Sequence, residues 1–170
     1  MIIGISGNNG AGKDTFGMLL QAALERKGHK VQRRAFADAL YFISTYLFNT
    51  PTKADCDATP SLKNRPYLNV TVRDILILIG KKMREIDPDV WVNLLKKNAS
   101  SESILIITDV RFQNEAAICD KLLRVFRNGQ DENVGECFGE TIENNGSLDD
   151  LQRRAEEWIV SSGLFPNSQA

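Results

Sequence analysis

A glycine-rich segment near the amino terminus carries the clearest chemical signal in the sequence. Residues 7–15 read GNNGAGKDT and fit the pattern G-x-x-x-x-G-K. In that pattern the glycines let the backbone curl, so that successive N–H groups turn towards phosphate oxygens and Lys13 reaches the terminal phosphates. The pattern usually has Ser or Thr directly after the lysine, whereas this chain has Asp14 there and Thr15 one place later.

The residues on both sides of the loop favour phosphate binding. The alternative is a glycine-rich turn that binds nothing. Residues 2–6 read as a buried strand, and Phe16, Leu19, Leu20 and Leu24 repeat at helical spacing behind the loop. The amino end of that helix adds partial positive charge. The Thr15 hydroxyl is placed to approach the phosphates or a Mg²⁺ ion. The residues predicted to bind ATP here are Asn9, Gly10, Ala11, Gly12, Lys13, Asp14 and Thr15.

A second charged segment follows the apolar run 103–108. Because ligands of open parallel sheets bind outside the carboxyl ends of the strands, Asp109 and Arg111 are predicted to lie beside the phosphate loop if the two strands are neighbours. An acid there can hold Mg²⁺ or its waters, and an arginine can bridge two phosphates. The alternative is a salt bridge at the strand end.

A third group lies between residues 73 and 92. Arg84 is next to apolar Met83 on a predicted helix, so it can flank the buried face and face a cleft. Trp91 has two interpretations, a core aromatic, which is the commoner role, or a platform on which a base stacks.

The elements that must position these residues are strands alternating with helices, which predicts an α/β fold with a parallel sheet and helices on both faces. Strands are expected at 2–6, 29–36, 103–108, 122–126 and 141–143. Helices are expected after the loop and at 38–48, 71–86, 87–95, 114–121 and 148–160, with Ile75, Leu76, Ile79, Met83 and Ile86 buried on the third. Residues 49–70 and 127–140 show no clear period and are expected to be irregular and functional or mobile.

Composition sets the outer limits. A chain of 170 residues predicts one domain, and a formal charge of -1 argues against a dedicated nucleic-acid binder. Cys56, Cys119 and Cys137 are too widely spaced to indicate a disulfide framework or a zinc site, so reduced thiols in the cytoplasm are expected. No apolar run is long enough to span a bilayer, and no signal peptide or membrane partner is indicated.

The chain resembles the phage-type deoxynucleoside monophosphate kinase family, and more distantly dephospho-coenzyme A kinase and phosphomevalonate kinase. The similar segments run nearly end to end: the phosphate loop, 36–40, 73–91, 109–115 and 144–148. The resemblance implies a P-loop NTPase three-layer sandwich of the nucleoside monophosphate kinase type. It also implies an acceptor-binding region at about 37–92 and a lid at about 127–140, both mobile.

The resemblance also assigns roles. It places Asp38, Arg73 and Arg84 on the acceptor side, where Trp91 is a further candidate. Arg111 would lie near the transferring phosphoryl group and Arg127 in the lid, so Lys13, Asp109, Arg111 and Arg127 form the expected catalytic set. Asn145 and Gly146 would lie beside adenine, and Thr15 and Asp109 would hold Mg²⁺.

Two departures from the family stand out. The lid has Cys137-Phe138-Gly139-Glu140 where a His-x-Ser-Glu-like element is expected, and Tyr41 stands where a lysine often follows Leu40. The implied activity is transfer of the γ-phosphoryl group of ATP to a deoxynucleoside monophosphate, in the host cytoplasm if the chain is of phage origin. A small-metabolite kinase of the same fold and a non-catalytic nucleotide-binding regulator stay open, as do monomer and homodimer and the preferred base.

Overall fold

The computed structural model describes residues 1–67, 69–100, 102–129 and 139–164. These residues form two compact units: residues 1–35 with 99–170, and residues 36–98. We call them unit 1 and unit 2 and describe each by itself. The predicted acceptor-binding region, 37–92, falls within unit 2. Most of the predicted lid lies outside the described residues.

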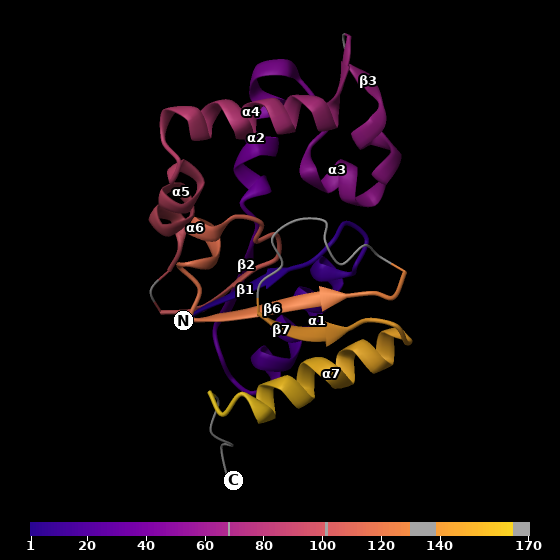
Figure 1. Cartoon of the computed structure of the whole chain (residues 1–170), viewed down its shortest axis with the longest axis vertical. Helices are drawn as coiled ribbons and strands as arrows, with labels where there is room; N and C mark the ends of the chain where they lie inside the picture. The colour runs from indigo at the N-terminus through magenta and orange to yellow at the C-terminus, as the bar shows by residue number, and fades with distance from the viewer. Residues whose placement is uncertain (68, 101, 130–138, 165–170) are drawn as a thin grey trace. The chain divides into compact units, whose positions relative to one another are not determined.

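Unit 1 is built on a five-stranded sheet in the order β2-β5-β1-β6-β7 (Figure 1). The strands are β1 (Ile2–Ser6), β2 (Val31–Arg34), β5 (Ile104–Ile107), β6 (Lys121–Phe126) and β7 (Glu140–Glu143). Every neighbouring pair is parallel, which confirms the predicted parallel sheet. The chain leaves β1 towards the β2 edge and leaves β6 towards β7, so the carboxyl ends of β1 and β6 form a switch point of the kind where ligands bind.

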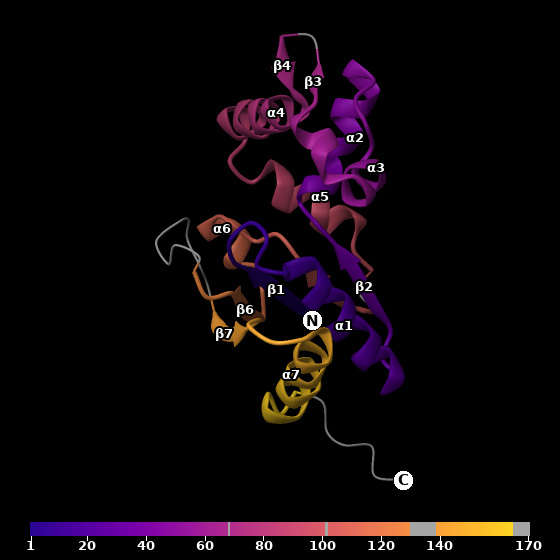
Figure 2. The same ribbon diagram turned by 90° about the vertical axis from the view of Figure 1, so that its right-hand side faces the viewer.

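Two helices cover one face of this sheet. They are α1 (Lys13–Arg26) and α7 (Leu148–Ser161), which pack against each other (Figure 2). The core between them and the sheet includes Ile3, Ile5 and Phe16, none of which is exposed. On the other side of β1, Gly4 faces Cys119 and Val110, from the segment that contains α6 (Gln113–Ala116). The layers are therefore helix, sheet and helix, as expected for the α/β class.

The helix expected at 114–121 is shorter than predicted. It ends at Ala116 because the chain joins the sheet soon afterwards: the Ile2 N–H donates to the Asp120 carboxylate at 2.6 Å, and the Asp120 N–H donates to the Ile2 carbonyl at 2.8 Å. This pair fixes the start of β6 next to β1. The periodicity of 114–121 gave no warning of it, because the tie is made by residues far apart in the sequence.

Unit 2 is mostly helical. Its elements are α2 (Ala37–Phe48), α3 (Lys53–Ala58), a 3₁₀ helix η1 (Pro60–Asn64), β3 (Pro66–Tyr67), β4 (Val70–Thr71), α4 (Val72–Ile86) and α5 (Val90–Asn98). The expectation of an irregular 49–70 segment was wrong, because Thr52 and Asp55 form a capping box that starts α3 and Cys56 of that helix is buried. Thr71 and Asp74 form the same motif at the start of α4, as the predicted cap required.

Two further expectations for unit 2 were wrong in detail. Ile86 is 79% exposed, because it is the last residue of α4 and lies past the buried part of that helix. The next helix begins at Val90 and not at Asp87, because the Asp87 carboxylate accepts the Asp89 N–H at 2.9 Å and holds a turn there.

Among the described residues, no helix is long and apolar enough to cross a membrane.

Candidate active site

The loop after β1 has the backbone geometry of a phosphate-binding turn. Gly10 and Gly12 have φ values of 76° and 96°, in the left-handed region that favours glycine. Backbone that alternates into this region turns successive N–H groups to one side and makes an anion-binding concavity. Helix α1 begins at once, with the Phe16 N–H donating to the Gly12 carbonyl at 2.8 Å, so the amino end of a helix opens directly onto the loop.

Lys13 folds back over this loop. Its ammonium nitrogen donates to the Asn8 carbonyl at 2.8 Å, and the residue is only 9% exposed. This hydrogen bond holds the Lys13 amine against the turn. The predicted ATP-binding residues from Asn9 to Thr15 thus form one continuous turn with the lysine folded against it.

The first turn of α1 is tied to the end of β5. The Thr108 hydroxyl donates to the Asp14 carboxylate at 2.7 Å, and the Val110 N–H donates to the Ile5 carbonyl at 3.1 Å. Strands β1 and β5 are therefore neighbours, which was the condition for Asp109 to lie beside the phosphate loop. Asp109 is half-buried at the carboxyl end of β5, and Thr15 is half-buried in the first turn of α1.

The backbone at Arg111 is held by a buried carboxylate. Glu115 is 2% exposed, and its side chain accepts the backbone N–H groups of Arg111 at 2.8 Å and of Phe112 at 3.1 Å. The Arg111 side chain itself is exposed. The backbone at Arg111 is thus held by Glu115 while its side chain is exposed.

The ends of β6 and β7 complete this side of unit 1. Arg127 follows β6 and donates from Nε to the Asn144 carbonyl at 3.1 Å. The Asn145 amide oxygen accepts the Asn128 N–H at 2.7 Å, and the Asn144 amide nitrogen donates to the Ala11 carbonyl of the phosphate loop at 2.7 Å. Arg127, Asn145 and Gly146 were assigned to the nucleotide side from the resemblance alone. All three lie in segments that these hydrogen bonds connect to the loop.

In unit 2, Asp38 lies in a groove between α2 and α3. The groove has a volume of about 430 Å³ and is lined by Asp38, Tyr41, Phe42, Thr45, Tyr46, Thr52, Lys53 and Ala54. The Lys53 amine donates to the Asp38 carboxylate at 2.7 Å, with the two side chains 30% and 40% exposed. Burial, followed by the neighbouring Cys56 thiol, raises the pKa of Tyr41 well above its usual range, so its phenol stays protonated. The groove therefore offers a paired charge, a phenol and exposed aromatic rings.

The other predicted acceptor residues lie elsewhere in unit 2. Arg73 is exposed in the first turn of α4. Arg84 Nη1 and Trp91 Nε1 both donate to the Gly80 carbonyl, at 3.2 and 3.4 Å. Trp91 is 3% exposed, so in this structure it is a core residue. Stacking of Trp91 on a base is a role that its burial does not support.

The donor groups near the loop fit a nucleotide-bound Mg²⁺ better than a metal site made by the protein alone. Within 1–67, 69–100, 102–129 and 139–164, no group of three or more His, Cys, Asp or Glu residues could hold a metal ion. Mg²⁺ commonly takes one or two protein oxygens and fills its other positions with phosphates and waters. One hydroxyl, from Thr15, and one carboxylate, from Asp109, suit that arrangement.

Comparisons with known proteins give distant structural likenesses. An APS kinase of Mycobacterium tuberculosis matches with 11% identity and a TM-score of 0.48, covering 94% of this chain and 96% of that one. A gluconokinase from Sinorhizobium meliloti matches with 13% identity and a TM-score of 0.46, covering 98% and 97%. A sugar kinase from a Janibacter species matches with 13% identity and a TM-score of 0.41, covering 94% of each chain. No family model and no curated protein matches the sequence. Likenesses this distant carry no argument about substrate, so the function has to be argued from the site.

Sequence reasoning missed three residues that the structure brings to these sites. Lys53 supplies an amine beside Asp38. Tyr41 stands where the proteins that the sequence resembles often have a lysine. The signal that could have found Lys53 is the Thr52-x-x-Asp55 pattern, which marks the start of a helix. Thr108 and Asn144 directly follow β5 and β7. The rule that predicted Asp109, that polar residues just past parallel strands lie near a ligand site, could also have found these two.

Proposed function

We propose that this chain transfers the γ-phosphoryl group of ATP to the phosphate of a deoxynucleoside 5'-monophosphate. The observation that carries the proposal is the turn of residues 7–15, with left-handed glycines, a helix starting at its end and Lys13 folded over it. Phosphoryl transfer depends on positioning and charge neutralisation more than on covalent chemistry, and this turn supplies both for a triphosphate.

The roles on the nucleotide side combine the chemistry of each group with the family resemblance, which alone assigns Arg127, Asn145 and Gly146. The loop N–H groups and Lys13 bind the β- and γ-phosphates, and Asn145 and Gly146 flank adenine. Thr15 and Asp109 hold Mg²⁺, which neutralises charge on the phosphates when bound. Arg111 and Arg127 supply guanidinium groups that stabilise the charge of the transferring phosphoryl group.

The acceptor side belongs to unit 2. Asp38, Arg73 and Arg84 are assigned to the monophosphate, and Arg111 is assigned both to the transferring phosphoryl group and to the acceptor phosphate. The second pKa of a phosphate monoester is near ~6, so the attacking oxygen is already largely ionised at neutral pH. Such an acceptor needs no general base, and two negatively charged partners do need several arginines.

A kinase that acts on the hydroxyl group of a small metabolite is the second candidate. A hydroxyl acceptor requires a base, and the observation that favours this reading is Asp38, a carboxylate that lines a groove beside Lys53. A regulator that binds nucleotide without transferring phosphate is the third reading, and the number of arginines assigned to the acceptor argues against it.

A coupled assay of ADP release separates these functions. We expect turnover with at least one of dCMP, dGMP, dTMP and dAMP, and none with dephospho-coenzyme A or mevalonate phosphate. Lys13→Met should lose turnover while its thermal unfolding stays that of a folded protein. Turnover restricted to dephospho-coenzyme A would favour the second candidate, and turnover restricted to mevalonate phosphate would indicate a phosphate acceptor that is not a nucleotide. ATP binding without turnover on any acceptor would favour the third.

A further inference from the structure

Asn144 occupies a fixed position at the end of β7. Strand β7 pairs in parallel with β6, with Phe126 opposite Glu143, and the Asn144 N–H donates to the Phe126 carbonyl at 2.7 Å. On its other side the chain is anchored by the start of α7. There the Ser147 side chain accepts the Asp150 N–H, and the Asp150 carboxylate accepts the Ser147 N–H at 2.9 Å.

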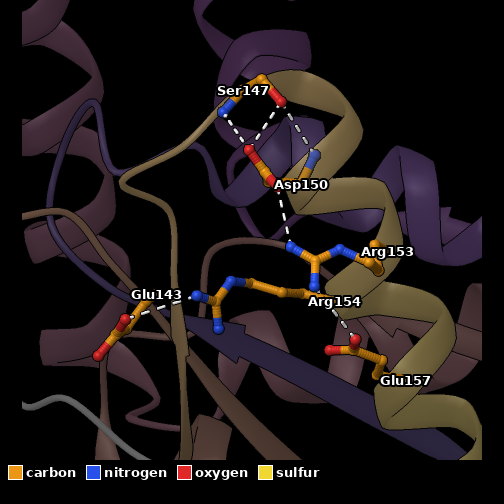
Figure 3. A network of polar contacts seen from close by, with 6 residues as sticks. All are labelled: Glu143, Ser147, Asp150, Arg153, Arg154 and Glu157. Carbon is orange, nitrogen blue, oxygen red and sulfur yellow. Dashed lines mark hydrogen bonds and ion pairs between the residues drawn. The ribbon is translucent and has the colours of Figure 1, made fainter.

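Figure 3 shows how this anchor is extended along α7. The Arg153 guanidinium lies 2.9 Å from the Asp150 carboxylate and 3.6 Å from the Glu157 carboxylate, measured from nitrogen to oxygen. The Arg154 guanidinium lies 3.5 Å from the Glu143 carboxylate of β7. The segment between β7 and α7 is therefore held at both ends, and Asn144 is presented at a set place. Each of these exposed ion pairs contributes little energy. The pairs of Arg153 lie within α7, whereas the pair of Arg154 with Glu143 joins α7 to β7.

The Asn144 side chain uses this position to hold the phosphate loop. It is a buried residue, 6% exposed, and its amide nitrogen donates to the Ala11 carbonyl at 2.7 Å. A side chain on Gly12 would overlap that same amide nitrogen, so the loop and the asparagine fit only because residue 12 is glycine. The Ala11 residue itself is fully buried, so loss of the bond takes a donor away from a buried carbonyl, which costs free energy.

The backbone of Asn144 makes a second connection. Its carbonyl accepts Nε of Arg127 at 3.1 Å. One residue therefore links three segments that meet at the switch point of the sheet: the loop after β1, the end of β6, and the segment that leads into α7. Each of these segments carries a residue assigned to ATP.

We infer that Asn144 is a positioning residue for ATP, which fixes the phosphate loop in its binding shape by holding the Ala11 carbonyl. It does so through the loop and touches no substrate atom. The inference rests on the proposed function in taking residues 7–15 as the phosphate site. It adds a residue that no motif of the loop contains.

The test replaces Asn144 and measures ATP binding apart from stability. Asn144→Leu is close in shape and removes the donor, and the Kd for MgATP is measured by calorimetry well below the melting temperature. We expect affinity to fall on the order of tenfold, with faster hydrogen exchange of the loop amides from Ala11 to Lys13 in the ligand-free protein. Asn144→Ser and Asn144→Ala form a second pair. Only Asn144→Ser keeps a hydrogen-bond donor at this position, so it should bind ATP more tightly than Asn144→Ala.

Ser44→Ala is the matched control. Ser44 is buried in unit 2 and bonds Thr50 at 2.7 Å, so this variant also loses a buried side-chain hydrogen bond. It should lower the melting temperature and leave both ATP affinity and loop exchange unchanged. The inference is overturned if the Asn144 variants bind ATP within about twofold of wild type and exchange their loop amides at the wild-type rate.

The same measurements keep the inference distinct from the proposed function. A wild-type protein that binds MgATP but phosphorylates no monophosphate would overturn the proposed acceptor, and the affinities would still judge Asn144. A wild-type protein that does not bind MgATP would overturn the proposed function. The exchange rates alone would then decide whether Asn144 holds the loop.

Discussion

The Thr108 hydroxyl donates a 2.7 Å hydrogen bond to the Asp14 carboxylate, which joins the end of β5 to the first turn of α1. Asp14 stands where the phosphate-loop pattern usually has Ser or Thr. In this chain the Asp14 side chain instead bonds the residue that follows β5, and the hydroxyl proposed to approach the phosphates belongs to Thr15, one residue later.

Thr108→Val should destabilise the protein, because it keeps the shape of a residue that is 1% exposed and leaves Asp14 without this donor. A hydrogen bond to a charged group contributes about 1.5–3 kcal/mol, and the lower end applies because Asp14 is exposed. Urea denaturation gives the loss, and Asp14→Asn should show a smaller one, since an amide oxygen can still accept. If Thr108→Val and wild type are equally stable, the hydrogen bond between Thr108 and Asp14 does not stabilise the fold.

Gly12→Ala should cost more stability than Gly28→Ala. Both glycines have positive φ, 96° and 85°, so both variants carry backbone strain of about 1 kcal/mol or more. Only at Gly12 would the new methyl group overlap the Asn144 amide, because nothing lies within 4 Å of a Cβ at Gly28. Thermal unfolding of the two variants compares them directly, and identical losses would mean that the Gly12 contact is unimportant.

Arg111→Ala should lower kcat on the order of a thousandfold and leave ATP affinity nearly intact. The backbone at this position is held by Glu115, and a side-chain deletion keeps those two hydrogen bonds. Single-turnover kinetics with saturating ATP measure the chemical step. Arg26→Ala, which removes an exposed arginine paired with Glu156, is the control, and an unchanged kcat for Arg111→Ala would exclude Arg111 from the mechanism.

Asp38→Asn separates the two kinds of acceptor. If the acceptor is a phosphate, no base is required and the chemical step should change by less than about tenfold at saturating acceptor. The amide can still accept a bond from Lys53, which keeps the groove intact. A fall in turnover beyond about a thousandfold would support a hydroxyl acceptor instead.

Asp150→Ala tests the pH dependence of the α7 cap. The Ser147 N–H and hydroxyl, followed by Arg153, lower the pKa of Asp150 to about 2 in the folded protein. An Asp in the unfolded chain has a pKa of about 3.9. The ionised Asp150 carboxylate therefore stabilises the folded protein fully above that pH, and this stabilisation is lost as the pH falls towards 2. Wild type should therefore exceed the variant in stability at pH 7, and acid-dependent denaturation curves should converge near pH 2. A difference that stays constant with pH would indicate a role unrelated to charge.

Several elements of both units could be predicted because each has a strong local signal. The apolar run before Asp109, the glycines of the loop and the Thr71 cap were all read correctly, and β5, the loop and α4 are where they were expected. Local pattern fixes these because the hydrophobic period and the cap chemistry act within a few residues.

What could not be predicted depends on partners far along the chain. Asn144 bonds Ala11, which is 133 positions away, and Thr108 bonds Asp14, which is 94 positions away. For Trp91 the sequence favours a core ring but leaves a stacking platform open, and its burial and the hydrogen bond from its N–H to the Gly80 carbonyl place it in the core. The short helix at 113–116 is cut off by a sheet contact at Asp120, which no periodicity reveals.

The insertion point of unit 2 has an evolutionary consequence. Residues 36–98 connect β2 to β5, which are adjacent and parallel. The chain must therefore run back from the carboxyl end of β2 to the amino end of β5. A tight turn cannot make that return, and deletion of the segment would break the register of both strands. Exchange of the whole segment for another of sufficient reach would leave every strand of the five-stranded sheet in place. Under the proposed function, new acceptor preferences would be acquired by swapping this one crossover, and chimaeras joined at residues 35 and 99 would test this.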